Sequence, residues 1–320
     1  MIASLAGVGH LPDTATTVDQ TTIRQPIDCT GVGLHSGAEA RMTLRPAGAD
    51  AGIVFVRADL AGARVPARYD HVVDTRLGTT LAEPGGALVH SVEHLMAALW
   101  GCGIDNLIVE LDGPEVPVMD GSAEPFVFLV ECAGIRRLDA PRRVVRVLKP
   151  VVVADGDRSL ALTPDDRSSV RVEIEFAHPV IGRQALDFDC DDGSFKSELA
   201  RARTFGLESE VAAMRATGRG LGGSLGNAVV VGADRVLNEG GLRFPDEFVR
   251  HKVLDCLGDL YLAGARIVGR LEAVRAGHRL NNALLRRLFA APANFALEAA
   301  ALPAWAGPRV RPGDRVAALA

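Results

Sequence analysis

Apolar and polar positions alternate along short segments of the first 140 residues, with turn-forming residues between them. A period of two residues is typical of strands that are buried on one face. Between residues 91 and 99 the spacing becomes helical, with Ser91 as the expected N-cap and Glu93 in the first turn. The predicted elements are strands at 40–45, 53–57 and 106–111 and helices at 91–99 and 123–133.

The same order of elements returns in the second half of the chain. We predict strands at 144–153, 159–162, 170–176, 228–231 and 267–273 and helices at 194–201, 209–217, 245–263 and 281–288. Strand-rich blocks closed by helices indicate an α+β fold of two similar sandwiches, although no residue-level repeat relates them. The expected divisions are a loose tail at 1–20, a first domain at 21–139, a linker at 140–143, a second domain at 144–292 and a peripheral tail at 293–320.

Composition narrows the function class. The chain has 320 residues and a net charge of −5, so a general nucleic-acid binder, which usually shows a basic footprint, is not expected. It contains no apolar run of membrane-spanning length, and its first residues lack the features of a signal peptide. The five cysteines are scattered, which favours reduced thiols in a cytoplasmic protein and gives no cysteine-based zinc site.

A column of polar residues lies on the predicted helix at 245–263. His251, Asp255 and Asp259 are four residues apart, so their side chains stack on one helix face. The residues between them are largely apolar, and buried charges are costly unless they bind a metal or pair with each other. An intrahelical ion pair between His251 and Asp255 is the alternative that spacing leaves open.

Zinc in hydrolases usually takes three protein ligands, and His251 with Asp255 can supply two of them. His94 is a candidate for the third, and the adjacent Glu93 could act as a base without being a ligand. The alternative for this pair is a helix N-terminus with a stabilising glutamate and a buried, hydrogen-bonded histidine.

His278 follows Gly277 at a predicted strand-to-helix junction. Held by Asp259, a protonated His278 would be a suitable general acid near neutral pH, whereas the alternative is a helix-start histidine without a role. A basic cluster flanks these positions and could attract phosphate groups, or it could be a solvated rim. Its members are Arg250, Lys252, Arg275 and Arg279.

Seven motifs stand in order along the chain and together resemble one family. They are GVGLHSG at 31–37, SVEHLMAA at 91–98, MDGSAEPF at 119–126, ARTFG at 202–206, LNEGGLRF at 237–244, RHKVLDCLGD at 250–259 and GHRLNN at 277–282. The chain resembles the UDP-3-O-acyl-N-acetylglucosamine deacetylases of lipid A synthesis, from about residue 22 to residue 288.

This resemblance implies a zinc amidase with two domains, each a two-layer β-α-α-β sandwich, and an active site between them. It implies that His94, His251 and Asp255 bind zinc, that Glu93 is the general base, and that His278 is the general acid, oriented by Asp259. It also implies that Thr204 stabilises the oxyanion, that Phe205 packs on the sugar and that Lys252 lies near polar groups of the substrate. In this family a β-α-β insert, here about 204–231, forms a passage for the acyl chain, with Leu207, Val211, Ala228 and Val230 as lining candidates.

The expected substrate is therefore an acylated UDP-sugar, from which the 2-acetamido group would be hydrolysed to acetate and a free amine. Two other functions stay open. One is a catalytically silent module that binds a sugar nucleotide or a lipid, although such a binder would need neither a base nor an acid. The other is a zinc hydrolase with a different amide substrate. We expect a monomer.

Overall fold

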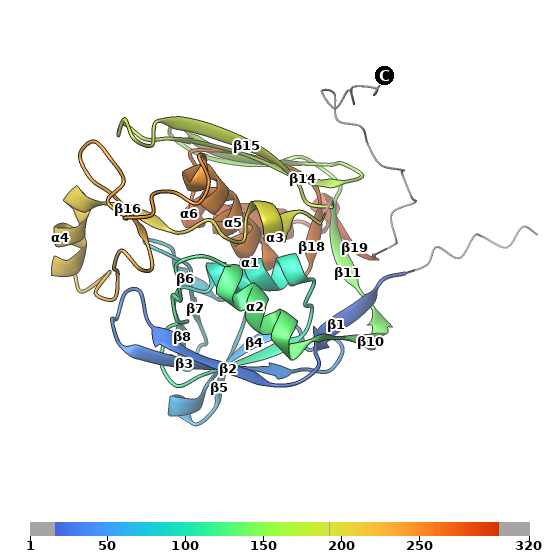
Figure 1. Cartoon of the computed structure of the whole chain (residues 1–320). Helices are drawn as coiled ribbons and strands as arrows, with labels where there is room; N and C mark the ends of the chain where they lie inside the picture. The colour runs from blue at the N-terminus through green and yellow to red at the C-terminus, as the bar shows by residue number, and fades with distance from the viewer. Residues whose placement is uncertain (1–16, 192, 301–320) are drawn as a thin grey trace, which may run out of the picture.

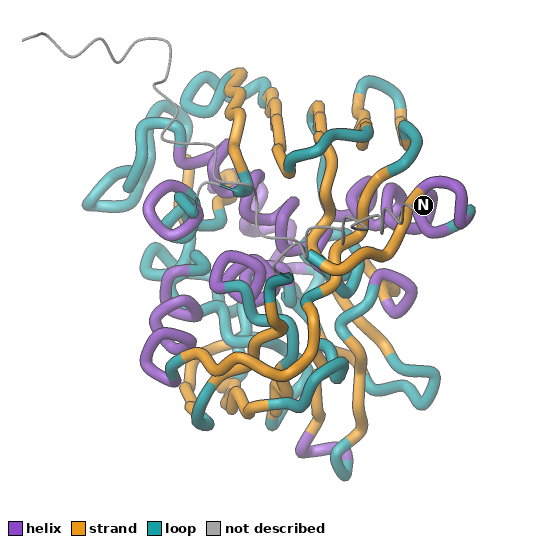
Figure 2. Tube along the Cα trace, turned by 90° about the vertical axis from the view of Figure 1, so that its right-hand side faces the viewer, coloured by secondary structure: helices purple, strands orange, loops and turns teal. Residues whose placement is uncertain are grey.

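The computed structural model describes residues 17–191 and 193–300. Two groups of strands lie on opposite sides of a layer of helices, and most helices keep this central position when the molecule is turned by 90° (Figures 1 and 2). The fold is therefore α+β, and the predicted fold class is confirmed. In the described residues, no helix is long and apolar enough to cross a membrane.

The lower sheet in Figure 1 has five strands and comes from the first half of the chain. Its order is β2 (Ile27–Val32), β3 (Glu39–Pro46), β9 (Leu107–Leu111), β4 (Ile53–Arg57) and β5 (Ala63–Pro66). Burial alternates along β3 and β4, so that Met42, Leu44 and Phe55 are fully buried on one face. Helices α1 (Glu93–Cys102) and α2 (Glu124–Ala133) lie above this sheet (Figure 1).

The upper sheet has seven strands, and β18 (Arg266–Val274) is its centre. The first residues of β18 pair in parallel with β11, and its later residues pair with β13 and β14. The other six strands are β11 (Arg143–Val147), β12 (Val151–Asp155), β13 (Arg158–Thr163), β14 (Ser168–Glu175), β15 (Arg183–Asp189) and β19 (Phe295–Ala299). Helices α5 (Glu247–Tyr261) and α6 (His278–Phe289) lie beneath it (Figure 1).

Smaller elements complete the described chain. They are the pair β1 (Asp19–Ile23) and β10 (Ile135–Pro141), the three strands β6 (Val72–Asp74), β7 (Thr80–Ala82) and β8 (Leu88–Val89), helix α3 (Phe195–Glu198), and three 3-10 turns at Ala58–Leu60, Tyr69–His71 and Pro292–Asn294. Residues 204–231 contain β16 (Phe205–Leu207), α4 (Glu208–Ala216) and β17 (Val229–Val231), and the two strands pair in parallel.

Several predicted elements need correction. Ser91 is not the N-cap of α1: Val92 precedes the helix, while Ser91 has a φ of 60° and donates its hydroxyl to Glu115 Oε1 (3.2 Å). The strand predicted at 144–153 is two strands, since Pro150 has no N–H to donate to a sheet. The helix predicted at 194–201 is limited to Phe195–Glu198, and β15 was not predicted.

Several observed strands cross the predicted divisions of the chain. Asp19 and Gln20, expected in the loose tail, begin β1. The expected linker at 140–143 is occupied by the end of β10 and the start of β11, separated by Arg142 alone. Residues 295–299, expected to be peripheral, form β19, which pairs along the whole of β11. Residues 1–16 and 301–320 of the two predicted tails lie outside the described residues.

Candidate active site

Helices α1 and α5 cross in direct backbone contact, and this crossing builds the site. A Cβ atom placed on Gly258 of α5 would lie 2.0 Å from the carbonyl oxygen of Glu93 on α1, so only glycine permits this approach. Glu93 and His94 open α1, while His251, Asp255 and Asp259 follow one another along α5. The crossing therefore brings the first turn of α1 against the polar column predicted on α5.

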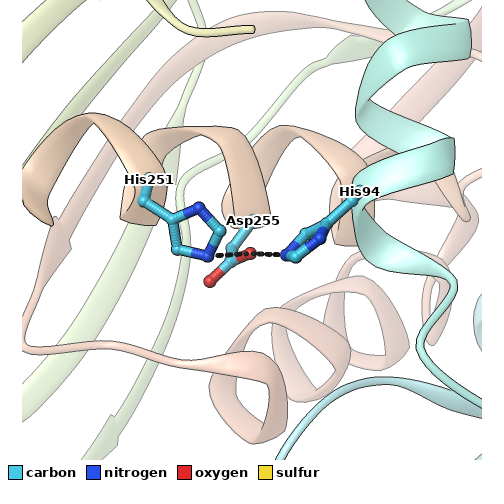
Figure 3. A group of neighbouring side chains, drawn as sticks. All are labelled: His94, His251 and Asp255. Carbon is cyan, nitrogen blue, oxygen red and sulfur yellow. Dashed lines mark ion pairs between the residues drawn. The ribbon is translucent and has the colours of Figure 1, made fainter. Parts of the chain in front are cut away.

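Three buried side chains converge at the crossing (Figure 3). Nε2 of His94 lies 3.4 Å and Nε2 of His251 lies 3.3 Å from Asp255 Oδ1. One ligand atom from each residue lies within 4.8 Å of the others. His251 donates its Nδ1–H to the carbonyl oxygen of Ala202 (3.1 Å), which leaves its Nε2 as the free lone pair. Two imidazoles and a carboxylate with this orientation are a donor set that suits a divalent metal such as zinc.

The protonation states of the three residues also suit metal binding. Burial lowers the pKa of His251 to about 3, so this imidazole is neutral. Burial would raise the pKa of Asp255, but its electrostatic interactions with His251 and with the Lys252 ammonium outweigh burial and hold that pKa well below its usual range. Burial would lower the pKa of His94, but the hydrogen bond and charge of Asp255 raise it. To bind a metal ion, a histidine must be neutral and an aspartate must be ionised. A bound cation would displace any proton shared by His94 and Asp255.

Lys252 was expected near polar groups of the substrate, but it also contacts one of the metal-ligand candidates directly. Its Nζ donates to Asp255 Oδ2 (2.8 Å) and stands 5.8 Å from the centre of the Phe205 ring. Burial would lower the pKa of Lys252, but the charge of Asp255 and their hydrogen bond raise it, so the ammonium persists. Lys252 therefore orients the second oxygen of the Asp255 carboxylate and places a positive charge on the wall of the cleft.

Asp259 lies one turn beyond Asp255 and binds a different histidine. Its Oδ2 accepts hydrogen bonds from Nδ1 of His278 and Nδ2 of Asn281, both at 2.8 Å, and its Oδ1 accepts from the hydroxyl of Thr79 at 2.5 Å. Burial opposes the charged form of His278, but the charge and hydrogen bond of Asp259 raise its pKa to about 9. His278 is therefore held as an imidazolium at neutral pH.

Two of these partners were missed by the sequence analysis. Asn281 lies within the GHRLNN motif, three residues after His278, and is almost completely buried. Helical spacing could have indicated that this polar side chain faces the same side as His278. Thr79 is also buried, but it lies 180 residues from Asp259 in the sequence and no local pattern connects the two. Its backbone N–H also donates to Glu93 Oε2 (2.9 Å).

One cleft of about 760 Å³ joins these groups. The predicted site residues that line it are Glu93, His94, Thr204, Phe205, His251, Lys252, Asp255 and His278. Asp259 is not on its wall, because it lies behind His278. The cleft also has apolar lining that the sequence analysis did not propose, including Leu34, Leu77 and Phe126.

The structure does not bring the four acyl-passage candidates into this cleft. Leu207, Val211, Ala228 and Val230 are half-buried positions of the 204–231 segment, and none is among the residues that line it. Thr204 and Phe205, at the start of the same segment, do reach it. The backbone of Thr204 is fixed on both sides, since its N–H donates to Gly121 and its carbonyl oxygen accepts from Val229.

The arrangement is typical of hydrolases that use one metal ion: two histidines and a carboxylate converge, with the Glu93 carboxylate and the His278 imidazolium beside them. Residues 20–290 match the model of the LpxC family, described as UDP-3-O-acyl N-acetylglycosamine deacetylase, and the chain belongs to this family.

Curated relatives carry the same description. The UDP-3-O-acyl-N-acetylglucosamine deacetylase of Phenylobacterium zucineum is 52% identical over 275 residues, which cover 85% of this chain and 94% of the relative. Those of Acidithiobacillus ferrooxidans and Anaeromyxobacter dehalogenans are 53% and 52% identical. These matches cover 85% and 86% of this chain and 90% and 89% of the relatives.

Proposed function

We propose that this protein is a zinc-dependent deacetylase that hydrolyses the 2-acetamido group of UDP-3-O-acyl-N-acetylglucosamine, an early step of lipid A synthesis. The observation that carries the proposal is the convergence of His94, His251 and Asp255 beside Glu93 and His278 in one cleft. Membership of the deacetylase family and the names of its relatives support this choice of substrate. The products are acetate and the free 2-amino sugar nucleotide.

In this proposal His94, His251 and Asp255 hold the zinc ion. When bound, zinc supplies Lewis-acid polarisation of the amide carbonyl and of the attacking water. Glu93 accepts the proton of that water as its oxygen bonds to the acetyl carbon. The Thr204 hydroxyl donates to the developing oxyanion. His278 gives its Nε2 proton to the departing nitrogen as the carbon–nitrogen bond breaks, so that the amine does not leave as an anion.

The surroundings of the cleft suit a sugar nucleotide with an acyl chain. Lys252 and Arg76 supply positive charge at its wall, and Phe205 supplies an aromatic face for a sugar ring. Phe205 begins β16, so the half-buried apolar residues of the 204–231 segment continue from the cleft wall. We propose that Leu207, Val211, Ala228 and Val230 contact the acyl chain further out.

Residues 19–141 and 143–299 would form two domains around the site, with the boundaries moved to the observed strands. We propose that the protein acts as a monomer in the cytoplasm. Sedimentation velocity with the purified protein tests whether it is a monomer, and a single species near the chain mass of 33.8 kDa is expected.

The proposal is tested by metal analysis coupled to acetate release from acylated and non-acylated UDP-N-acetylglucosamine. We expect about one zinc per chain and acetate mainly from the acylated substrate. Glu93→Gln should keep its zinc and lose about 10²- to 10⁴-fold in kcat, the usual contribution of general base catalysis. His94→Ala should lose the metal, and a folded His94→Ala protein with full zinc content would disprove the ligand assignment. Zinc-loaded protein that releases acetate from neither substrate would favour a silent binder.

A further inference from the structure

Thr79 contacts both carboxylates that flank the metal-ligand candidates. Its backbone N–H donates to Glu93 Oε2 (2.9 Å), and its side-chain hydroxyl donates to Asp259 Oδ1 (2.5 Å). The residue is 1% exposed, so neither bond competes with bulk water. Glu93 is on α1 and Asp259 is on α5, and Thr79 therefore joins two elements that are far apart in the sequence.

The backbone around Thr79 is itself fixed. Its carbonyl oxygen accepts a hydrogen bond from the N–H of Val92 (3.3 Å), just before α1. His35 Nε2 lies 3.1 Å from the carbonyl oxygen of Leu77, two residues earlier, and donates its proton to it. Strand β7 begins at the next residue, Thr80. The two donors of Thr79 are thus presented by a rigid corner of the chain.

Each oxygen of Asp259 has its own partner set. Oδ2 accepts from His278 and Asn281, and Oδ1 accepts from the Thr79 hydroxyl. Without that hydroxyl, Oδ1 would be a buried acceptor with no other hydrogen-bond partner among the described residues, and rotation of the carboxylate would move Oδ2 away from His278. The direction of the Nδ1–H bond of His278 sets the direction in which Nε2 points into the cleft.

We propose that Thr79 is a positioning residue. It fixes the carboxylate of Glu93, the general base, relative to the carboxylate of Asp259, which orients the general acid His278. Its amide holds Glu93 and its hydroxyl locks the rotation of Asp259, so that Glu93 and the His278 ring face the same substrate atoms. Sequence spacing gives no sign of this role. The inference rests on the proposed function, because the roles of Glu93 and His278 come from it.

The test compares Thr79→Val, which keeps the shape and the backbone N–H, with Thr79→Ser, which keeps the hydroxyl. Partners that orient the groups of a metal site usually contribute about 10- to 100-fold to activity. We expect Thr79→Val to lose about 10- to 100-fold in kcat with KM and zinc content unchanged, and Thr79→Ser to restore most of the rate. Thr80→Val is the matched control, because it removes a buried neighbouring hydroxyl that binds His90 instead (2.9 Å).

A double-mutant cycle with Asp259→Asn separates positioning from general destabilisation. If Thr79 acts through Asp259, Thr79→Val should reduce kcat little further in the Asp259→Asn background. Losses that multiply, a Thr79→Val enzyme with wild-type kcat, or an equal loss in Thr80→Val would overturn the inference.

A second readout needs no turnover. In protein with ¹⁵N-labelled histidine, the Nδ1–H resonance of His278 should be sharp and downfield in the wild type and in Thr79→Ser, and shifted or broadened in Thr79→Val. An unchanged resonance in Thr79→Val would overturn the inference. If the wild type released no acetate, the proposed function would fail while this measurement still tested the contact.

Discussion

Each buried carboxylate of the site has a specific set of donors. Asp255 faces two imidazoles and the Lys252 ammonium, while Asp259 faces an imidazolium, an amide and a hydroxyl. Two buried carboxylates one helical turn apart would repel each other if neither had a positively charged or hydrogen-bonding partner. Their partners are different residues, so one helix face provides a metal-ligand candidate and a partner for the proposed acid, His278.

The hydrogen bond between Asp259 and His278 should affect how activity depends on pH. The pKa of His278 is raised from the ordinary 6.5 to about 9, chiefly by Asp259 against the effect of burial. The proposed acid is therefore protonated at neutral pH, and kcat/KM should fall as the pH rises above about 9. The same shift stabilises the fold fully below pH 6.5, and this stabilisation is lost as the pH rises through 9.

Asp259→Asn removes the charge and should return the pKa of His278 towards its ordinary value. We expect the alkaline limb of the kcat/KM profile to move to lower pH by more than one unit, with a lower maximum. Asp246→Asn, which loses only an ion pair with Arg250, serves as the control. An alkaline limb at the same pH in Asp259→Asn and in the wild type would show that His278 is not the acid.

Much of this residue-scale arrangement was predictable. Helical spacing placed His251, Asp255 and Asp259 on one face, and the structure keeps them there. Spacing could not distinguish an ion pair from a metal site, because both need the same i and i+4 positions. The Thr79 contact could not be predicted either, since it depends on where a corner between strands lies in three dimensions.

At the scale of elements, the site depends on how closely α1 and α5 approach. Strong periodicity made α5, β14 and β18 predictable, whereas a weak pattern hid β15. In β15 only Phe188 is buried, so the alternation that marks a strand is faint. The closeness of the helices is a different property, because it depends on Gly258, whose role is not visible in an apolar pattern.

Gly258→Ala should therefore weaken both the fold and the proposed metal site. The new Cβ would lie 2.0 Å from Glu93 O, and relief of such overpacking typically costs about 1–3 kcal/mol. The shift of α1 would carry His94 away from Asp255, so we expect zinc affinity to fall at least tenfold. Urea denaturation and zinc competition titration measure the two effects.

Gly101→Ala is the matched control on the other end of α1. Its Cβ would meet the Phe195 ring at 2.0 Å, away from the ligands, so stability should fall without a change in zinc affinity. Equal losses of zinc affinity in the two variants would mean that the α1–α5 crossing does not set the ligand geometry.

At the scale of the whole molecule, the two sheets share one continuous hydrophobic core. It contains Phe55 and Leu107 of the lower sheet, Leu160 and Leu271 of the upper sheet, and helix residues between them. Trp100 of α1 contacts the second half directly, with its ring centre 5.6 Å from that of Phe195 and 4.5 Å from the Arg266 guanidinium carbon. A core shared in this way should couple the unfolding of the halves, although chains of several domains often unfold in steps.

We therefore expect one cooperative transition in urea. Trp100 fluorescence reports separation of the halves, because its ring lies between α1 and residues of the second half. The chain has a second tryptophan, Trp305, so the measurement uses Trp305→Phe and compares fluorescence with circular dichroism at 222 nm. Coincident midpoints are expected because opening the contact between the halves would expose buried residues of α1 and α5 together. A fluorescence midpoint clearly below that of circular dichroism would mean that the halves separate before they unfold, and that the site is lost while both sheets persist.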